Sequence, residues 1–121
     1  MCAKRHIKRC VIGEGMIEYK DAEDALNYLA GTDEEYARAK TLYDALCEQK
    51  KSVAAIEYGK LQGSAAEKTQ QALASDPYQN HLKAMMDAHL EFEIVRNKRI
   101  TNQAVIEMWR SVNSARQKGN I

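Results

Sequence analysis

The sequence predicts an all-α fold, built from long helices that pair as an antiparallel hairpin or coiled-coil-like bundle, with short accessory helices, in an oligomer. The 121 residues include one Pro, six Gly and one Phe, fewer turn residues and aromatics than an all-β fold needs. Residues 75–118 contain no internal Gly or Pro apart from the Pro77 of the helix start. At about 1.5 Å per residue such a helix would extend roughly 60 Å, too long for one compact domain of this size.

The first fifteen residues fit no helical period, and we expect 1–15 to be an extension that is disordered or not native. Gly13-Glu14-Gly15 directly before Met16 can be encoded by a purine-rich run that resembles a bacterial ribosome-binding site. Met16 is therefore a candidate natural start. Residues 16–121 then form a single helical domain, the number of domains expected for a chain of this length.

The sequence pattern predicts two helices in the first half of the domain. Residues 21–30 have an acidic first turn that suits the helix dipole, and Gly31 is expected to end this helix. A capping box of Thr32 and Glu35 then starts a second helix, which the helical period extends to about Gln62. One face of the second helix collects the following apolar residues: Tyr36, Ala39, Tyr43, Leu46, Cys47, Val53, Ala54, Tyr58 and Leu61.

A short third helix is predicted between the two long ones. Gly63 breaks the helical pattern, and Ser64 with Glu67 forms a capping box at the start of residues 64–74. This segment would bridge the end of an antiparallel hairpin formed by the long helices.

The last helix has clear start and stop signals. Asp76 followed by Pro77 suits a first helical turn, and Gly119 supplies the stop. Apolar residues at i+4 spacing form two sets along it, separated by Asn97 and Thr101. This polar break either fixes register or oligomer state or marks a solvent-exposed bend.

Self-association is expected because the apolar residues of the last helix exceed what one partner helix can cover. Met85, Phe92, Val105 and Trp109 fall outside the best apolar stripe, so further contacts should cover them. The candidate oligomer interface consists of Leu82, Met86, Leu90, Ile94, Ile100, Met108, Trp109 and Val112.

The sequence offers little for catalysis or ligand binding. Its three cysteines, Cys2, Cys10 and Cys47, form no close pair, which fits a reducing compartment. The three histidines lack the spacing of a metal site, and no nucleophile, base and orienting group come together. We therefore expect no enzyme, metal, cofactor or small-molecule substrate. No apolar run approaches the ~20 residues that cross a bilayer, so we expect a cytoplasmic protein without membrane contact.

Positive charge gathers at the C-terminal end, where residues 94–121 hold six Lys or Arg against Glu107. Arg96, Arg99 and Arg110 share one side of the last helix, off the main apolar stripe. Such an arginine row could contact successive phosphates, while Trp109 could pack or stack on a base. Alternatively, the arginines pair with the acidic segments 33–35 and 87–93 of a neighbouring subunit, or form a solvated surface. The candidate nucleic-acid contacts are Arg96, Lys98, Arg99, Arg110, Arg116 and Lys118, with Lys50, Lys51 and Lys60 from the first long helix.

Three short motifs over about residues 40–118 resemble the UvsY-type recombination mediators of large tailed phages. They are Gln49-Lys50-Lys51 followed by Tyr58 and Gly63, the start Ala74-Ser75-Asp76, and the basic helix 96–118. The resemblance implies a helical protein that forms rings, binds single-stranded DNA and helps to exchange single-strand-binding protein for recombinase. The basic pair that this family has before the glycine falls here on Ala55 and Glu57, so other cations would have to bind the DNA.

The expected function is that of a non-enzymatic phage accessory protein, homo-oligomeric, which binds single-stranded DNA in recombination or replication in the cytoplasm of a bacterial host. Its partners would be DNA and recombination proteins. The alternative is a helical adaptor or inhibitor that binds a host or phage protein without contacting DNA. Affinity for an oligonucleotide that falls steeply with salt would favour the first.

Overall fold

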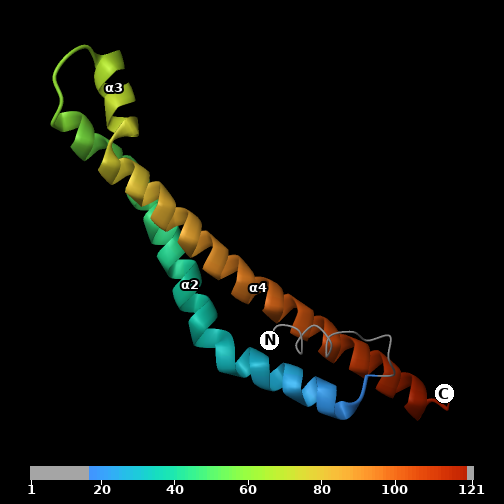
Figure 1. Ribbon diagram of the computed structural model, residues 1–121. Coiled ribbons are helices and arrows are strands. Elements are labelled where there is room, and N and C mark those ends of the chain that lie inside the picture. The colour runs from blue at the N-terminus through green and yellow to red at the C-terminus, as the bar shows by residue number, and fades with distance from the viewer. Residues whose placement is uncertain (1–16, 120–121) are drawn as a thin grey trace, which may run out of the picture. The chain divides into compact units, whose positions relative to one another are not determined.

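The computed structural model describes residues 17–119 and confirms the all-α class over that range (Figure 1). Its helices are α2 (Tyr19–Gly59, 41 residues), α3 (Ala65–Ala74, 10 residues) and α4 (Asp76–Gln117, 42 residues), and residues 17–119 form no strand. Within the same range, none of these helices is long and apolar enough to cross a membrane. The expectations for residues 1–15 lie outside the described residues.

Helix α2 continues through Gly31, so the break predicted there is wrong. Thr32 and Glu35 consequently lie inside a helix and cap no helix start. The reason is energetic: one Gly in a helix costs only about 1 kcal/mol relative to Ala, which the contacts of the surrounding turns can offset. At its other end, α2 stops at Gly59, slightly before the predicted Gln62.

The start of α2 is fixed by hydrogen bonds around Glu18. The backbone N–H of Glu18 donates to Oδ2 of Asp21 at 2.9 Å. In return, the Glu18 carbonyl accepts from the amides of Asp21 and Ala22 at 3.0 and 3.3 Å. These bonds satisfy the amides of Glu18 and Asp21, N–H groups that the start of a helix leaves without i−4 partners.

Helix α3 starts with the predicted capping box, which is confirmed. The Glu67 amide donates to Oγ of Ser64 at 3.2 Å, and the Ser64 amide donates to Oε1 of Glu67 at 3.3 Å. Hydrogen bonds from Ser64 to this carboxylate lower the pKa of Glu67. Gly63 precedes the box with φ +125°, a backbone conformation that favours glycine.

Helix α4 has nearly the predicted bounds, but Ser75 rather than Asp76 caps its start. The Tyr78 amide donates to Oγ of Ser75 at 3.4 Å, and the Gln79 amide donates to the Ser75 carbonyl at 3.0 Å. Asp76 is the first helical residue, where its carboxylate suits the helix dipole. Gly119 has φ +78° and donates to the helix carbonyl three residues earlier, which confirms the predicted glycine stop.

The contacts of the chain fall into two compact units that divide both long helices. Unit 2 comprises Thr32–Asn97, and the described part of unit 1 comprises 17–31 and 98–119. In α4 the division falls at the predicted polar break, and in α2 it falls at the glycine inside the helix.

In unit 2, α2 and α4 run antiparallel, because later positions on α2 meet earlier ones on α4. The Tyr36 ring stacks on Phe92 with centroids 5.5 Å apart, and the Leu46 carbonyl lies 2.7 Å from Nε2 of His81. The nine residues of the apolar face predicted for α2 are all partly buried, as expected. The buried residues of this unit are Ala72, Tyr78, Ala88 and Val95.

In unit 1, the first turns of α2 lie antiparallel to the end of α4. Nη1 of Arg99 donates to the Leu29 carbonyl at 2.9 Å, and the rings of Tyr19 and Trp109 meet edge to face with centroids 5.7 Å apart. The buried residues of this unit are Ile17, Ala22 and Ala25.

The face of α4 that packs on α2 is not the predicted stripe. The four apolar residues that were expected to need outside cover are all partly buried within the chain. The reason is geometric: a row with i+4 steps winds around a helix, whereas alternating steps of three and four stay on one side. The residues that follow these alternating steps, all partly or fully buried, are Tyr78, His81, Met85, Ala88, Phe92, Val95, Arg99, Asn102, Ile106, Trp109 and Asn113.

Candidate interaction surfaces on helix α4

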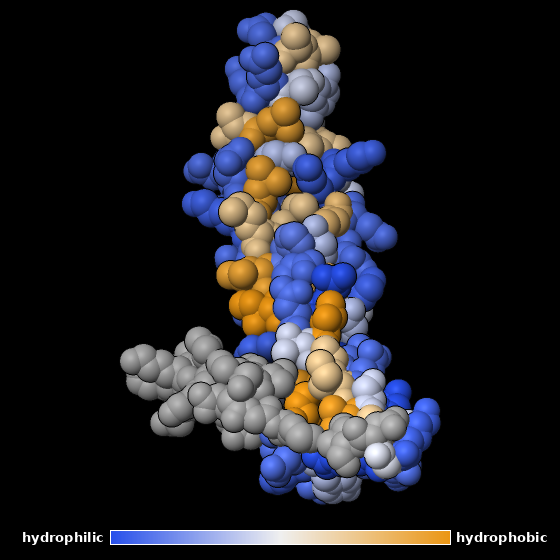
Figure 2. All heavy atoms as spheres, turned by 90° about the vertical axis from the view of Figure 1, so that its right-hand side faces the viewer, coloured by the Kyte–Doolittle hydropathy of each residue, from blue (hydrophilic) through white to orange (hydrophobic). Residues whose placement is uncertain are grey.

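Three large apolar side chains of unit 2 point away from the rest of their unit. Met86, Leu90 and Ile94 are 71, 61 and 40% exposed, and their i+4 spacing makes them neighbours on the surface of α4. We call these three residues the outer row. Figure 2 shows apolar side chains of this kind gathered among charged ones on the face turned to the viewer.

Among residues 17–119, more large apolar side chains are exposed than buried. Its seven buried residues include four alanines, and no large side chain between residues 17 and 119 is completely buried. By contrast, ten large hydrophobic residues of the same range are at least 40% exposed. Apolar side chains exposed singly are ordinary on a protein surface, whereas neighbouring ones such as those of the outer row form a patch of the kind that can bind another protein.

The rest of the predicted oligomer interface is divided between exposed and partly buried positions. Ile100 and Met108 are each 49% exposed in unit 1. Leu82 in unit 2 and Val112 in unit 1 are partly buried. Trp109 packs edge to face on Tyr19, so its ring contributes to the contacts inside unit 1.

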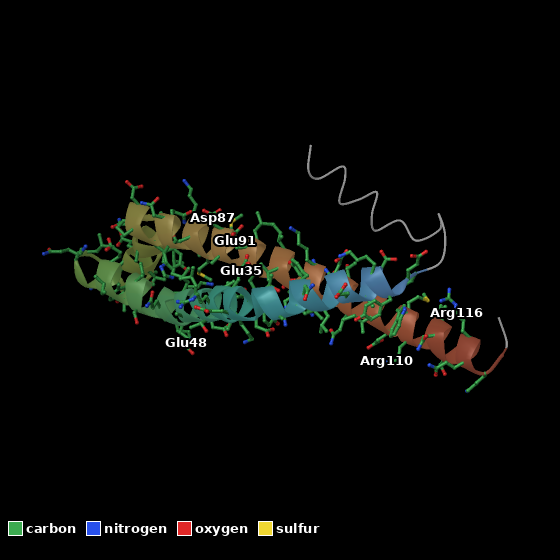
Figure 3. The ribbon with its side chains drawn as sticks, turned by 90° about the horizontal axis from the view of Figure 1, so that it is seen from below. Glu35, Glu48, Asp87, Glu91, Arg110 and Arg116 are labelled. Atoms are coloured by element: carbon green, nitrogen blue, oxygen red, sulfur yellow. The ribbon has the colours of Figure 1, made fainter. Side chains whose placement is uncertain are left out.

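Two carboxylates flank the outer row. Asp87 lies three residues before Leu90 and Glu91 three residues before Ile94, so each is a surface neighbour of an apolar side chain. Both are exposed and extend from α4 in Figure 3. Neither forms an ion pair with any other residue of the range 17–119.

Two of the predicted DNA-contacting cations pair with carboxylates three residues away in the sequence. Nη1 of Arg96 lies 3.2 Å from Glu93, with the two side chains 46 and 35% exposed. Nζ of Lys60 lies 2.9 Å from Glu57. An exposed pair such as Arg96–Glu93 contributes about 0–1 kcal/mol. Both pairs place a negative charge beside the cation and so reduce the local positive potential.

Arg99 takes an inner position instead of a place in the predicted arginine row. It is one of the partly buried residues of the packing face, and its guanidinium donates to the Leu29 carbonyl. Presenting Arg99 to a phosphate would break this bond. The row expected from Arg96, Arg99 and Arg110 is therefore not available as one exposed surface.

The other predicted cations are exposed. In unit 1 these are Lys98, Arg110, Arg116 and Lys118, all on α4 or directly after it. Figure 3 shows Arg110 and Arg116 leaving α4 on different sides. In unit 2, Lys50 and Lys51 are exposed next to each other on α2.

The sequence did not reveal a ring cluster inside unit 2. Tyr43 stacks on His89 with centroids 4.6 Å apart and an interplanar angle of 15°, and the Phe92 ring stacks on Tyr43 as well. A hydrogen bond with Cys47 raises the pKa of the Tyr43 phenol. The signal that could have found the contact between Tyr43 and Phe92 is the alternating spacing of three and four on α4.

Among residues 17–119, no three His, Cys, Asp or Glu side chains are placed to hold a metal ion. His81 lies against a backbone carbonyl, and His89 stacks on Tyr43 with its Nε2 3.4 Å from the carboxylate of Glu93.

Comparison with protein-family models, with curated proteins and with solved structures found no match for this chain.

Proposed function

We propose that this chain is a non-enzymatic helical interaction protein, a coiled-coil-like antiparallel hairpin that binds further copies of itself through its outer row. The exposure of Met86, Leu90 and Ile94 on one long helix carries the proposal. Burying such side chains contributes about 25 cal/mol per Å² of apolar area. The small alanine-rich core supports the proposal as well, because a second chain would add the apolar contacts that the single chain lacks.

The test removes apolar area from the outer row without adding charge. The variant Met86→Ser/Leu90→Ser should weaken assembly about thirtyfold, if each side chain contributes about 1 kcal/mol. Sedimentation equilibrium over a range of concentrations measures the mass, which for a single chain is 13.7 kDa. Circular dichroism confirms that the helices are intact.

A matched control removes two apolar side chains from α2. Leu42 and Ile56 are 54 and 60% exposed, so Leu42→Ser/Ile56→Ser loses a similar apolar area and should assemble as the wild type does. A wild-type mass of one chain at every concentration contradicts the proposal. Equal weakening by both double variants contradicts the role of the outer row.

A second candidate function is binding of single-stranded DNA in phage recombination or replication, together with recombination proteins. The observation that favours it is the charge of residues 98–118, with five Lys or Arg against one Glu, and the exposure of Lys98, Arg110, Arg116 and Lys118. Two contacts argue against DNA binding. Arg99 bonds to the Leu29 carbonyl and Trp109 packs on Tyr19, so neither side chain is presented to DNA.

Salt dependence of oligonucleotide binding tests this second function. Each phosphate contact on single-stranded DNA contributes about 0.7 to the slope of log affinity against log salt. Arg110→Gln should lower the slope by about that amount. Lys83→Gln, which removes a positive charge from unit 2, should leave it unchanged. No binding at ~50 mM salt rules the function out.

A further inference from the structure

The outer row is the centre of a longer line of exposed residues on α4, which we call the seam. The seam consists of Lys83, Met86, Leu90, Ile94 and Asn97, all exposed. At 100° per residue these side chains fall within about 80° of one another. The steps between them are three, four, four and three residues, a spacing that keeps a face turned toward one partner helix. The seam thus has a cation at its start, three apolar side chains, and an amide at its end.

Charged residues flank the seam on both sides. Glu93 lies about 60° to one side of Leu90, whereas Asp87, Glu91 and Lys98 lie about 60–100° to the other side. Helix α4 continues without a break through Lys98. Three of the four flanking side chains are exposed, and that of Glu93 is 35% exposed, so a second helix on the seam would meet both edges.

We propose that two copies of this chain pair through the seam with their α4 helices parallel and in register. This inference rests on the proposed function and adds the orientation of the second copy and the residues that fix it. Each apolar residue of the outer row then meets its own counterpart. Asn97 meets Asn97 of the second copy, and each amide can both donate and accept a hydrogen bond. A single polar residue of this kind in an apolar seam fixes the register.

Parallel pairing also brings opposite charges together. In a parallel pair, a residue on one edge of the seam meets a residue about five positions later on the other edge of the second helix, as e and g residues do in coiled coils. Glu93 and Lys98 have this spacing, so the dimer forms two such pairs. The carboxylate of Glu93 also lies 3.2 Å from Arg96 of its own chain, but two carboxylate oxygens can accept from several donors.

Antiparallel pairing is disfavoured by charge. An antiparallel pair centred on Leu90 places Asp87 of each copy beside Glu91 of the other. It also places Lys83 beside Lys98, and like charges placed together cost free energy. A register moved by four residues would bring Lys98 to Asp87 of the other copy, but it would set the first residue of the outer row against that lysine. The parallel pair has one contact of like charge on the seam, between the two Lys83 side chains at its end, where their long stems can diverge into water.

Disulfide formation tests the orientation. The test uses a chain whose native cysteines Cys2, Cys10 and Cys47 are replaced by alanine. In a glutathione redox buffer, Asn97→Cys should form a disulfide with its own copy, because parallel pairing places residue 97 opposite itself. An antiparallel pair centred on Leu90 would place residue 97 opposite residue 83, so a mixture of Asn97→Cys with Lys83→Cys would form the mixed disulfide. Intact mass distinguishes the two products.

A matched control measures disulfides that form by random collision. Glu48 is exposed on α2 (Figure 3), away from the seam. Glu48→Cys in the same cysteine-free chain should form its disulfide much more slowly than Asn97→Cys does. Circular dichroism confirms that all these variants keep their helices.

Charge reversal tests the pairs at the edges. Glu93→Lys and Lys98→Glu should each weaken self-association about tenfold, because each creates two pairs of like charge. An equimolar mixture of the two variants should recover most of the wild-type affinity, because both pairs of the mixed dimer are opposite in charge again. Glu35→Lys on α2 and Arg110→Glu, about 200° from Leu90 on α4, make the same changes of charge elsewhere and should keep wild-type association (Figure 3).

The outcomes distinguish this inference from the proposed function. The inference is wrong and the proposed function stands if Met86→Ser/Leu90→Ser weakens association while Asn97→Cys forms no disulfide faster than the control, or while the mixed disulfide predominates. The inference is equally wrong if the mixture of charge-reversed variants shows no recovery. A wild-type protein that stays monomeric contradicts both.

Discussion

Replacing Gly31 by Ala should stabilise the protein, because the structure places this glycine inside α2. A glycine within a helix costs about 0.5–1 kcal/mol relative to alanine, since it loses more backbone entropy on folding. The structure shows no steric or backbone strain that would offset this gain in stability. A Cβ built on Gly31 meets no atom within 4 Å, and its φ is not among the positive values.

The expected result is an increase of about 0.5–1 kcal/mol in the free energy of unfolding. The assay is urea unfolding followed by circular dichroism at one fixed protein concentration, because assembly makes apparent stability depend on concentration. The m-value should stay the same, since the surface exposed on unfolding is unchanged. The thermal midpoint should rise by about 3–6 °C.

Gly63→Ala is the opposite control. Gly63 has φ +125°, so an alanine there is strained and should lower the free energy of unfolding by about 1 kcal/mol or more. If Gly31→Ala leaves stability unchanged or lowers it, residue 31 is not in a regular helix. That result would instead support the predicted break at Gly31, with one helix before it and another after it.

Three further predictions concern contacts inside the two units. Phe92→Ala removes a partly buried ring that stacks on Tyr36 and should cost about 2 kcal/mol of unfolding free energy, less than the roughly 3–5 kcal/mol of a fully buried ring. Arg99→Met keeps the side-chain length but loses the bond to the Leu29 carbonyl, so urea unfolding should show a loss of about 1 kcal/mol. The lowered pKa of Glu67 means that its contribution to stability is present at neutral pH and is lost as pH falls through the folded-state pKa. The Glu67→Ala variant should therefore differ from the wild type at neutral pH and approach it in acid, which thermal unfolding at several pH values measures.

Local signals in the sequence predicted the ends of α3 and α4 well. The Ser64–Glu67 capping box and the Gly119 stop depend on hydrogen bonds between residues close in sequence, so the residue types alone define them. Ser75 shows the limit of such signals. It competes with Asp76 for the cap of α4, and only the backbone path from α3 decides between them.

The packing face of α4 could not be chosen from the apolar residues alone. Large side chains occur on two sides of this helix, and the i+4 series with Leu90 is the more regular of the two. The face that packs includes His81, Arg99 and Asn102, polar residues that a hydrophobic stripe excludes. Whether such polar residues can lie in the interface depends on the groups of α2 that face them, and the sequence of α4 alone gives no information about those groups.

The same ambiguity limited the prediction of the candidate DNA surface. Arg96, Arg99 and Arg110 share one side of an isolated helix, but pairing with α2 turns Arg99 inward. The sequence showed correctly how much charge residues 98–118 carry, since that depends on composition. Which of these charges are presented on one surface depends on the second helix.

The ring contacts between α2 and α4 also restrict how the helices can slide past each other. A slip of seven residues, about 10 Å along the axis, would again bring apolar rows together, because those rows repeat with that period. It would also leave the imidazole of His81 and the guanidinium of Arg99 facing another main-chain carbonyl, since α2 has one at every residue. Phe92, by contrast, could no longer stack on both Tyr36 and Tyr43, and Trp109 would lose its contact with the ring of Tyr19. The rings therefore make a single alignment the best, where apolar contacts alone would tolerate several.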